Sequence, residues 1–237
     1  LALGMASKKK SHYSGIYAIA DEGLLQGRDI FAAVEEALAG GISMLQYRNK
    51  LANNSGSSNA SLNTAKQLAG LCKSYRVPLI INDNVDLCLA VAADGVHLGG
   101  SDQDLPSARA CLGEDAIIGA TCHASIEQAL IAQRQTADYI AFGRFFPSSS
   151  KPEAPAAHLG LLTEARAALS IPIVAIGGIN KENGASALKA GADMLAVIHA
   201  IFGGVQVAAQ SRQLVSMYEQ FTHERLTNSQ PPIYQAD

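Results

Sequence analysis

Short apolar runs alternate along the chain with longer amphipathic segments, and this alternation predicts parallel strands joined by crossover helices. The expected strands are Gly15–Ala20, Ser43–Tyr47, Leu79–Ile81, Gly95–Leu98, Ile117–Gly119, Tyr139–Phe142, Ile173–Ile176 and Met194–Val197. The expected helices include Asp29–Ala39, Leu62–Tyr75, Ser125–Gln135, Lys181–Ala190 and Ala208–Glu224. Eight strand–helix units that close on themselves give an α/β fold, the (β/α)8 or TIM barrel. The alternative is an open, doubly wound sheet.

A recurring signature marks the passages from helix to strand. It reads Ala39-Gly40-Gly41-Ile42, Ala92-Ala93-Asp94-Gly95-Val96 and Ala190-Gly191-Ala192-Asp193, with a weaker version at Gln135-Thr136-Ala137-Asp138-Tyr139. A glycine or small residue closes each helix before an apolar strand begins.

No linker divides the chain, so we expect one barrel domain over residues 15–224. Residues 1–14 are expected to form a flexible N-terminal extension and residues 225–237 a C-terminal tail. The polar segment Asn53–Ser61 is predicted to be a loop after the second strand. It is interpreted either as a mobile lid or as an ordinary surface loop.

Composition supports one large core, since 48% of the 237 residues are hydrophobic and 16% are charged. A net charge of -3 gives no electrostatic reason to expect nucleic acid or an anionic membrane as a partner. No apolar run approaches the roughly 20 residues of a membrane helix. The four cysteines form no CxxC pair, and no apolar stretch follows the N-terminal lysines. We therefore expect a cytoplasmic protein, as a monomer or a homo-oligomer.

Polar residues concentrate directly after the predicted strands, which is where the active sites of barrels lie. After the second strand, Gln46, Arg48 and Lys50 alternate with Tyr47 and Asn49. On an extended backbone the first three side chains point to one side. An amide and two cations on one side suit a polyanion such as pyrophosphate. The alternative is a solvated strand end.

Two carboxylates follow neighbouring strands. Asp83 comes after Leu79–Ile81, and Asp102 comes after Gly95–Leu98. Mg²⁺ usually binds one or two carboxylates together with phosphate oxygens and water, so the pair predicts a magnesium site. Asp83 could instead cap a turn or helix and Asp102 the next helix, and Asp104 could replace Asp102 as the ligand.

Groups suited to phosphate follow the later strands. The loop after the sixth strand contains Ser148, Ser149, Ser150 and Lys151. Glycines after the seventh strand and the helix start after the eighth form a backbone phosphate site in many barrels. Two anion sites, one with a predicted metal, indicate a two-substrate reaction that releases pyrophosphate. The four histidines at strand ends and in loops lack metal-ligand spacing, and we expect each to be hydrogen-bonded or partly buried: His97, His123, His158 and His199.

Six motifs resemble those of the thiamine-phosphate synthase (thiamine-phosphate pyrophosphorylase) family, in order from roughly Tyr17 to Phe202. They are Gln46-x-Arg48-x-Lys50, Ile81-Asn82-Asp83, Ala93-Asp94-Gly95-Val96-His97-Leu98-Gly99, Phe146-Pro147-Ser148-Ser149-Ser150-Lys151, Ala175-Ile176-Gly177-Gly178-Ile179 and Ala196-Val197-Ile198. Each lies at a predicted strand end.

The resemblance implies a role for each matching residue. A pyrimidine pyrophosphate is held by Gln46, Arg48, Lys50 and Asn82. A thiazole phosphate is held by Ser148, Ser150, Gly178, Ile198 and His199. Asp83 and Asp102 bind Mg²⁺, while Thr121 and Lys151 act on the leaving pyrophosphate. The sequence departs from the family at Thr121, Ser148, Ser150 and His199, and at Gly100 and Ser101 before the metal aspartate.

The implied activity is that of a transferase in thiamine biosynthesis. It joins 4-amino-2-methyl-5-hydroxymethylpyrimidine pyrophosphate to hydroxyethylthiazole phosphate, giving thiamine phosphate and pyrophosphate by a dissociative, Mg²⁺-assisted substitution. Two alternatives share the barrel. A thiazole tautomerase uses a histidine in the loop that carries His123, and a non-catalytic homologue only binds a phosphate ligand. Arg48, Lys50, Asn82, Asp83 and Asp102 together favour the synthase.

Overall fold

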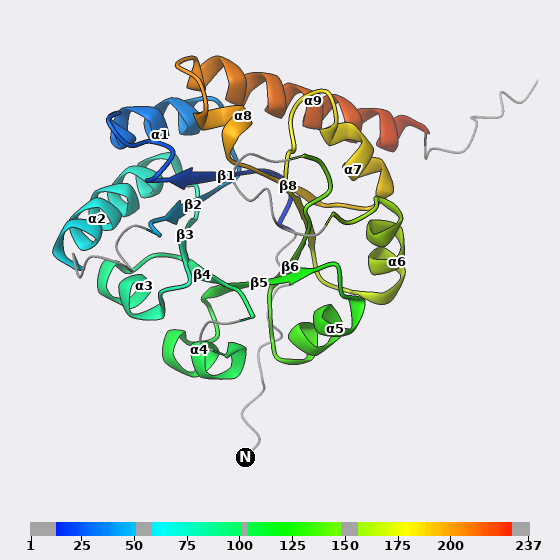
Figure 1. Ribbon diagram of the computed structural model, residues 1–237, viewed down its shortest axis with the longest axis horizontal. Coiled ribbons are helices and arrows are strands. Elements are labelled where there is room, and N and C mark those ends of the chain that lie inside the picture. Colours follow the sequence, from blue (N-terminus) through cyan, green and yellow to red (C-terminus); the bar gives the residue numbers. More distant parts are fainter. Residues whose placement is uncertain (1–12, 51–57, 101–103, 148–155, 229–237) are drawn as a thin grey trace, which may run out of the picture.

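Eight parallel strands pair in sequence order, and β8 pairs with β1 to complete a closed barrel (Figure 1). The structure, a computed structural model, describes residues 13–50, 58–100, 104–147 and 156–228. The strands are β1 (Gly15–Asp21), β2 (Met44–Arg48), β3 (Leu79–Asn82), β4 (Gly95–Leu98), β5 (Ile117–His123), β6 (Tyr139–Phe142), β7 (Ile173–Ile176) and β8 (Met194–Val197). The closure confirms the predicted TIM barrel and rules out the open, doubly wound sheet.

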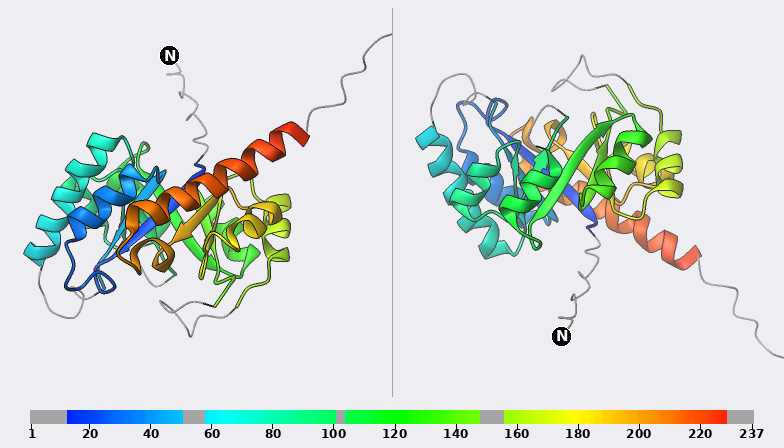
Figure 2. Two further views of the ribbon diagram at one scale, coloured as in Figure 1. Left: turned by 90° about the horizontal axis from the view of Figure 1, so that it is seen from above. Right: turned by 90° about the horizontal axis from the view of Figure 1, so that it is seen from below.

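Helices surround the barrel on its outer face (Figure 1). They are α1 (Ile30–Ala39), α2 (Ser58–Tyr75), α3 (Val85–Val91), α4 (Leu105–Leu112), α5 (Ile126–Arg134), α6 (Gly160–Ala168), α7 (Gly184–Ala190), α8 (His199–Phe202) and α9 (Val207–Asn228). The long helix α9 packs against α1, α7 and α8, and its C-terminal end projects beyond the barrel (Figure 2). Across the described ranges, no helix is both long and apolar enough to cross a membrane.

Several predicted helix boundaries were wrong. The predicted loop Asn53–Ser61 overlaps α2, which already begins at Ser58. Its polar first turn looks like a loop, but Ser61 is buried and accepts a hydrogen bond from Asn49. The lid hypothesis itself concerns residues 51–57, which lie outside the described residues. The predicted helix at Lys181 begins only at Gly184.

Residues 225–228, predicted as the start of the C-terminal tail, belong to α9, which continues to Asn228, and residues 229–237 lie outside the described residues. The strong helix formers Glu224, Arg225 and Leu226 extend the helix, and the helix-breaking prolines come only at positions 231 and 232.

Two apolar layers hold the fold together. The outer one lies between the sheet and the helices, where residues such as Leu45, Ile81 and Phe142 are fully buried. The inner one fills the barrel and contains Tyr17 and Tyr139. Alternate residues of each strand belong to different layers, as the two-residue period of a strand requires.

Aspartates of the helix-to-strand signature join neighbouring strands at the N-terminal ends of the strands, the bottom of the barrel. In three copies the aspartate carboxylate accepts the backbone N–H of the first or second residue of the preceding strand. The bonds join Asp94 to Leu79 (2.8 Å), Asp138 to Ile118 (2.8 Å) and Asp193 to Ile173 (2.7 Å). We call these three bonds the aspartate clasps. Each one joins neighbouring strands and gives a backbone donor at the start of a strand an acceptor.

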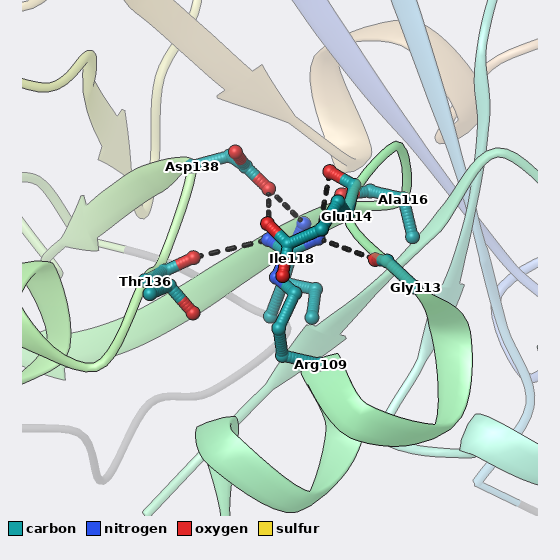
Figure 3. Close-up of polar contacts among 7 residues, drawn as sticks. All are labelled: Arg109, Gly113, Glu114, Ala116, Ile118, Thr136 and Asp138. Atoms are coloured by element: carbon teal, nitrogen blue, oxygen red, sulfur yellow. Dashed lines mark hydrogen bonds and ion pairs between the residues drawn. The ribbon is translucent and has the colours of Figure 1, made fainter. Parts of the chain in front are cut away.

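The clasp at Asp138 is reinforced by the buried guanidinium of Arg109 (Figure 3). Arg109 donates to Asp138 (2.6 Å) and to the backbone oxygens of Gly113 (2.9 Å), Ala116 (2.6 Å) and Thr136 (3.0 Å). One side chain of α4 thus joins the α4–β5 and α5–β6 connections, leaving the opposite, C-terminal end of the strands for the site.

Candidate active site at the C-terminal end of the barrel

A cavity of about 280 Å³ opens at the C-terminal ends of the strands. Seven of the predicted site residues line it: Gln46, Arg48, Asn82, Thr121, Gly178, Ile198 and His199. Lys50 and Asp83 are not among the lining residues, but they pair with each other, and Asp83 directly follows the lining residue Asn82. The remaining predicted site residues, Asp102, Ser148, Ser150 and Lys151, lie outside the described residues. Residues far apart in the sequence, such as Gln46 and Ile198, therefore meet around one cavity.

The strand β2 presents its side chains as the alternation predicted. Gln46 and Arg48 line the cavity, whereas Tyr47 packs into the outer layer. Asn49 also points away, since its amide donates to the Ser61 hydroxyl at 3.0 Å. The alternation argument was therefore correct for these residues.

Each of the two cations after the second strand meets a carboxylate. Arg48 pairs with Asp21 at the end of β1, and Lys50 pairs with Asp83 at the end of β3. Sequence reasoning missed Asp21. The signal was available, because Asp21 directly follows the predicted strand Gly15–Ala20, whereas Asp83 is the second residue after Leu79–Ile81.

Asp83 does not cap the helix that follows it. Asn84 does so, accepting the N–H of Leu87 at 2.8 Å. Asp83 itself has a positive φ of 63°, a conformation uncommon outside glycine, and its N–H donates to the His97 carbonyl at 2.8 Å. This conformation turns its carboxylate toward Lys50 rather than toward α3.

The cap of α4 is Asp104. Its carboxylate accepts the Ser107 N–H at 3.0 Å and the Ser107 hydroxyl at 2.8 Å, and these bonds hold the pKa of Asp104 below its usual value. The alternative in which Asp102 caps this helix is therefore wrong. Asp104 is also a poorer candidate for a metal ligand, because both carboxylate oxygens already accept hydrogen bonds.

Inside the cavity, Thr121 belongs to a network that the sequence did not reveal. His97 bonds the Thr121 hydroxyl through Nε2 (2.7 Å) and the Tyr139 hydroxyl through Nδ1 (3.0 Å). The Tyr139 hydroxyl contacts that of Tyr17 (2.8 Å), which accepts from Gln46 Nε2 (2.7 Å). His97 is buried and hydrogen-bonded, as predicted. Burial raises the pKa of Tyr17 and Tyr139 far above the ordinary 10, so both phenols stay protonated.

The opposite wall is formed by backbone at the ends of β7 and β8. Gly178 has a φ of 66°, and a Cβ there would lie 2.3 Å from the Pro147 carbonyl oxygen, so only glycine fits. Its own carbonyl accepts from Asn183 at 2.9 Å. The side chain of His199, at the start of α8, is exposed.

Arg144 is a second residue that sequence reasoning missed. It follows β6, lines the cavity and is half-buried. Gly177 permits its close approach, because a Cβ on Gly177 would lie 2.2 Å from the Arg144 Cβ. The rule that polar residues after strands line the site would have included it. Arg144 adds a cation at the end of the cavity that Gly177 and Gly178 form.

Comparison with known proteins places this site in a family. The family described as "Thiamine monophosphate synthase" matches residues 16–201. The chain belongs to the thiamine monophosphate synthase family. The thiamine-phosphate synthase of Thioalkalivibrio sulfidiphilus is 45% identical over 205 residues, covering 86% of this chain and 95% of that protein. That of Methylococcus capsulatus is 44% identical over 204 residues, covering 86% and 89%.

A solved structure supports the same family assignment. The thiamine phosphate pyrophosphorylase from Pyrococcus furiosus superimposes with a TM-score of 0.80 at 34% identity, covering 90% of this chain and 99% of that one. Both the fold and the family that the motifs predicted are confirmed.

Proposed function

We propose that the chain is a thiamine-phosphate synthase, a transferase that joins the pyrimidine pyrophosphate and the thiazole phosphate and releases pyrophosphate. The observation that carries the proposal is the shared cavity. Polar and cationic side chains of β2, β3 and β5 line one wall, and the glycines after β7 and the start of α8 line the other. Two phosphorylated substrates bound to these walls would meet between them.

On the first wall, Gln46 and Asn82 hold the pyrimidine and Arg48 its pyrophosphate. Arg48 is suited to this task because Asp21 pairs with its guanidinium and restricts its orientation, and a guanidinium binds phosphate oxygens in a fixed, bidentate geometry. Lys50 and Lys151 add positive charge next to the leaving group. On the second wall, the thiazole phosphate binds backbone at Gly178, Ile198 and His199.

The residues present fit a magnesium ion. The carboxylate of Asp83 lies after β3, turned away from α3 by its positive φ, and it already attracts one cation, Lys50. Carboxylate oxygens are the ligands that Mg²⁺ prefers, and substrate phosphates and water complete its shell. Asp102 is the proposed second ligand. When bound, Mg²⁺ offsets the negative charge that grows on the departing pyrophosphate.

The reaction needs no protein base. Arg48, Lys50 and Lys151 stabilise pyrophosphate as the bond to the pyrimidine methylene carbon breaks, and the thiazole nitrogen then attacks that carbon. Thr121 lies on the cavity wall, where its hydroxyl can donate to a pyrophosphate oxygen. Positioning and charge neutralisation supply the rate enhancement.

The test is product formation by the purified chain from both substrates, with Mg²⁺ and with EDTA. We expect thiamine phosphate and pyrophosphate in equal amounts, only with Mg²⁺. Binding of both substrates without any product would overturn the proposal in favour of a non-catalytic homologue.

The tautomerase alternative has one observation in its favour, because His123 lines the same cavity. Incubation with a thiazole carboxylate phosphate alone separates the two activities. We expect no isomerisation, and isomerisation without thiamine phosphate formation would favour the tautomerase.

A further inference from the structure

Five polar side chains form one hydrogen-bonded chain across the barrel interior, and we call this chain the relay. It runs from Gln46 through Tyr17, Tyr139 and His97 to Thr121, with links of 2.7, 2.8, 3.0 and 2.7 Å. Its two ends line the cavity, as do Tyr17 and His97 between them. It therefore connects a predicted pyrimidine-binding residue to a predicted leaving-group residue through three residues without an assigned role.

Packing holds the middle of the relay in place. Tyr17 and Tyr139 are 1% and 0% exposed, and their rings meet edge to face at 5.8 Å. The His97 ring stacks on Tyr139 with centroids 5.6 Å apart. Gly119 provides the space for this arrangement, because a Cβ there would lie 2.0 Å from the Tyr139 ring. The hydroxyls therefore have little freedom to choose other partners.

The protons in the relay can then be followed in order. Gln46 donates through Nε2 to Tyr17. Either phenol can donate in the contact between Tyr17 and Tyr139, and the order in which Tyr17 donates gives every hydrogen of the relay an acceptor. In this order Tyr139 donates to Nδ1 of His97. A neutral imidazole that accepts at Nδ1 carries its proton on Nε2, and donates it to Thr121. The Thr121 hydroxyl can then donate its own hydrogen to a ligand, and the Gln46 amide oxygen can accept a hydrogen bond from one.

We propose that Tyr17, Tyr139 and His97 are positioning residues that fix the polarity of the relay, so that Gln46 presents an acceptor and Thr121 a donor to the substrate. This inference rests on the proposed function. An aminopyrimidine offers its amino hydrogens to the Gln46 oxygen, and a pyrophosphate oxygen accepts from Thr121. The relay thus selects an aminopyrimidine against a 4-oxo pyrimidine, whose carbonyl would face the Gln46 oxygen.

Selection depends on the relay being continuous. Gln46 could serve an oxo group only by turning its amide, and Tyr17, Tyr139 and His97 would then all have to reverse together. Tyr139→Phe keeps the buried ring but removes the hydroxyl in the middle. In this variant Tyr17 can donate to the Gln46 oxygen, so the Gln46 amide can turn while the hydrogen bond between His97 and Thr121 stays as it is.

The experiment measures the dissociation constants of the 4-amino pyrimidine pyrophosphate and its 4-oxo analogue in the presence of Mg²⁺. We expect the intact chain to prefer the amino compound by about tenfold or more, the effect of one hydrogen bond with the wrong polarity. In Tyr139→Phe this preference should fall toward one. Tyr218→Phe, which removes a hydroxyl that donates to the Asp193 carbonyl outside the barrel, should keep it within about twofold.

A spectroscopic measurement on the unmodified chain does not depend on activity or on a variant that folds. Nitrogen-15 NMR of labelled histidine should show the ring of His97 protonated on Nε2. Protonation on Nδ1, or an unchanged preference in Tyr139→Phe, would overturn the relay. Absence of thiamine phosphate formation with the expected tautomer would instead overturn the proposed function and leave the polarity intact.

Discussion

Arg48 and Lys50 each contact a carboxylate, but the two pairs have different consequences. Arg48 and Asp21 are 17% and 14% exposed, so the guanidinium is held near one orientation and loses little freedom when it binds an anion. Lys50 is 45% exposed and Asp83 only 18%. Under the proposed function Lys50 would bind pyrophosphate and Asp83 would bind Mg²⁺. Before these ligands bind, Lys50 neutralises the charge of the Asp83 carboxylate.

At this scale, Asp83→Ala should lower turnover by about a hundredfold or more, because it removes the proposed ligand of the Mg²⁺ that would neutralise the leaving pyrophosphate. Binding of the thiazole phosphate, at the opposite wall, should not change. Steady-state turnover and calorimetric titration with thiazole phosphate measure the two effects.

Asp104→Ala is the matched control, since it removes a neighbouring carboxylate that caps α4. It should lower the melting temperature slightly and leave turnover unchanged. Equal loss of turnover and of thiazole phosphate binding in Asp83→Ala would mean that Asp83 is structural.

The strands and helices show where sequence patterns suffice. All eight strands were predicted, since parallel strands buried on both faces appear as short apolar runs. Helix ends were less predictable, because tertiary contacts set them. Ser58–Ser61 looks polar enough for a loop, yet Ser61 is buried against Asn49. In the site, residues that directly follow strands could be predicted.

The relay could not be predicted from the sequence, for a geometric reason. Tyr17 and Tyr139 lie within apolar strands 122 positions apart, where an aromatic residue normally indicates core packing. Their hydroxyls meet only because both side chains point inward in a closed barrel. No local pattern records that direction.

Within β5, Gly119→Ala should destabilise the fold by about 1–3 kcal/mol, because the new methyl group overlaps the Tyr139 ring. Urea denaturation of the variant and the unmodified chain measures this change in the free energy of unfolding.

Gly70→Ala in α2 is the control with the opposite sign. Gly70 is exposed within a helix, and no atom lies within 4 Å of its added Cβ. It should stabilise the fold by about 0.5–1 kcal/mol, since alanine favours the helix. If Gly119→Ala does not lower the free energy of unfolding, β5 or the Tyr139 ring must shift to accommodate the new methyl group, and the prediction is wrong.

Over the whole molecule, the residues that stabilise the strand starts and the residues of the candidate active site lie at opposite ends of the barrel. The aspartate clasps and Arg109 lie at the bottom, and the cavity lies at the C-terminal ends of the strands. Changes at the bottom should therefore affect unfolding without affecting turnover.

Arg109→Met tests this separation. It leaves Asp138 and several backbone oxygens without their buried donor, and should lower the free energy of unfolding by about 3–5 kcal/mol. Arg166→Met removes the equivalent pair with Asp193. The side chains of Arg166 and Asp193 are 39% and 33% exposed, so this change should lower the free energy of unfolding by only about 0–1 kcal/mol. Turnover per folded molecule should be unchanged in both, and a large loss of turnover in Arg166→Met would contradict the separation.

Alkaline pH should weaken the whole fold. Burial raises the pKa of Tyr17 and Tyr139 above the ordinary 10, and that of the Cys88 thiol from 9.0 to about 11. Above pH 9 the unfolded chain loses protons that the folded chain keeps, so the free energy of unfolding falls as pH rises. Urea denaturation between pH 8 and pH 11 should show this decline, and a flat profile would contradict it.

The aspartate clasps carry one consequence for how such a protein can change over evolutionary time. Each clasp is made by an aspartate just before a strand and the backbone at the start of its neighbour, and so does not depend on the loops at the C-terminal ends of the strands. Those loops can then be replaced, lengthened or recombined without disturbing strand registration. A laboratory library that randomises only them, with Asp94, Asp138 and Asp193 kept, should yield mostly folded proteins from which new substrate preferences can be selected.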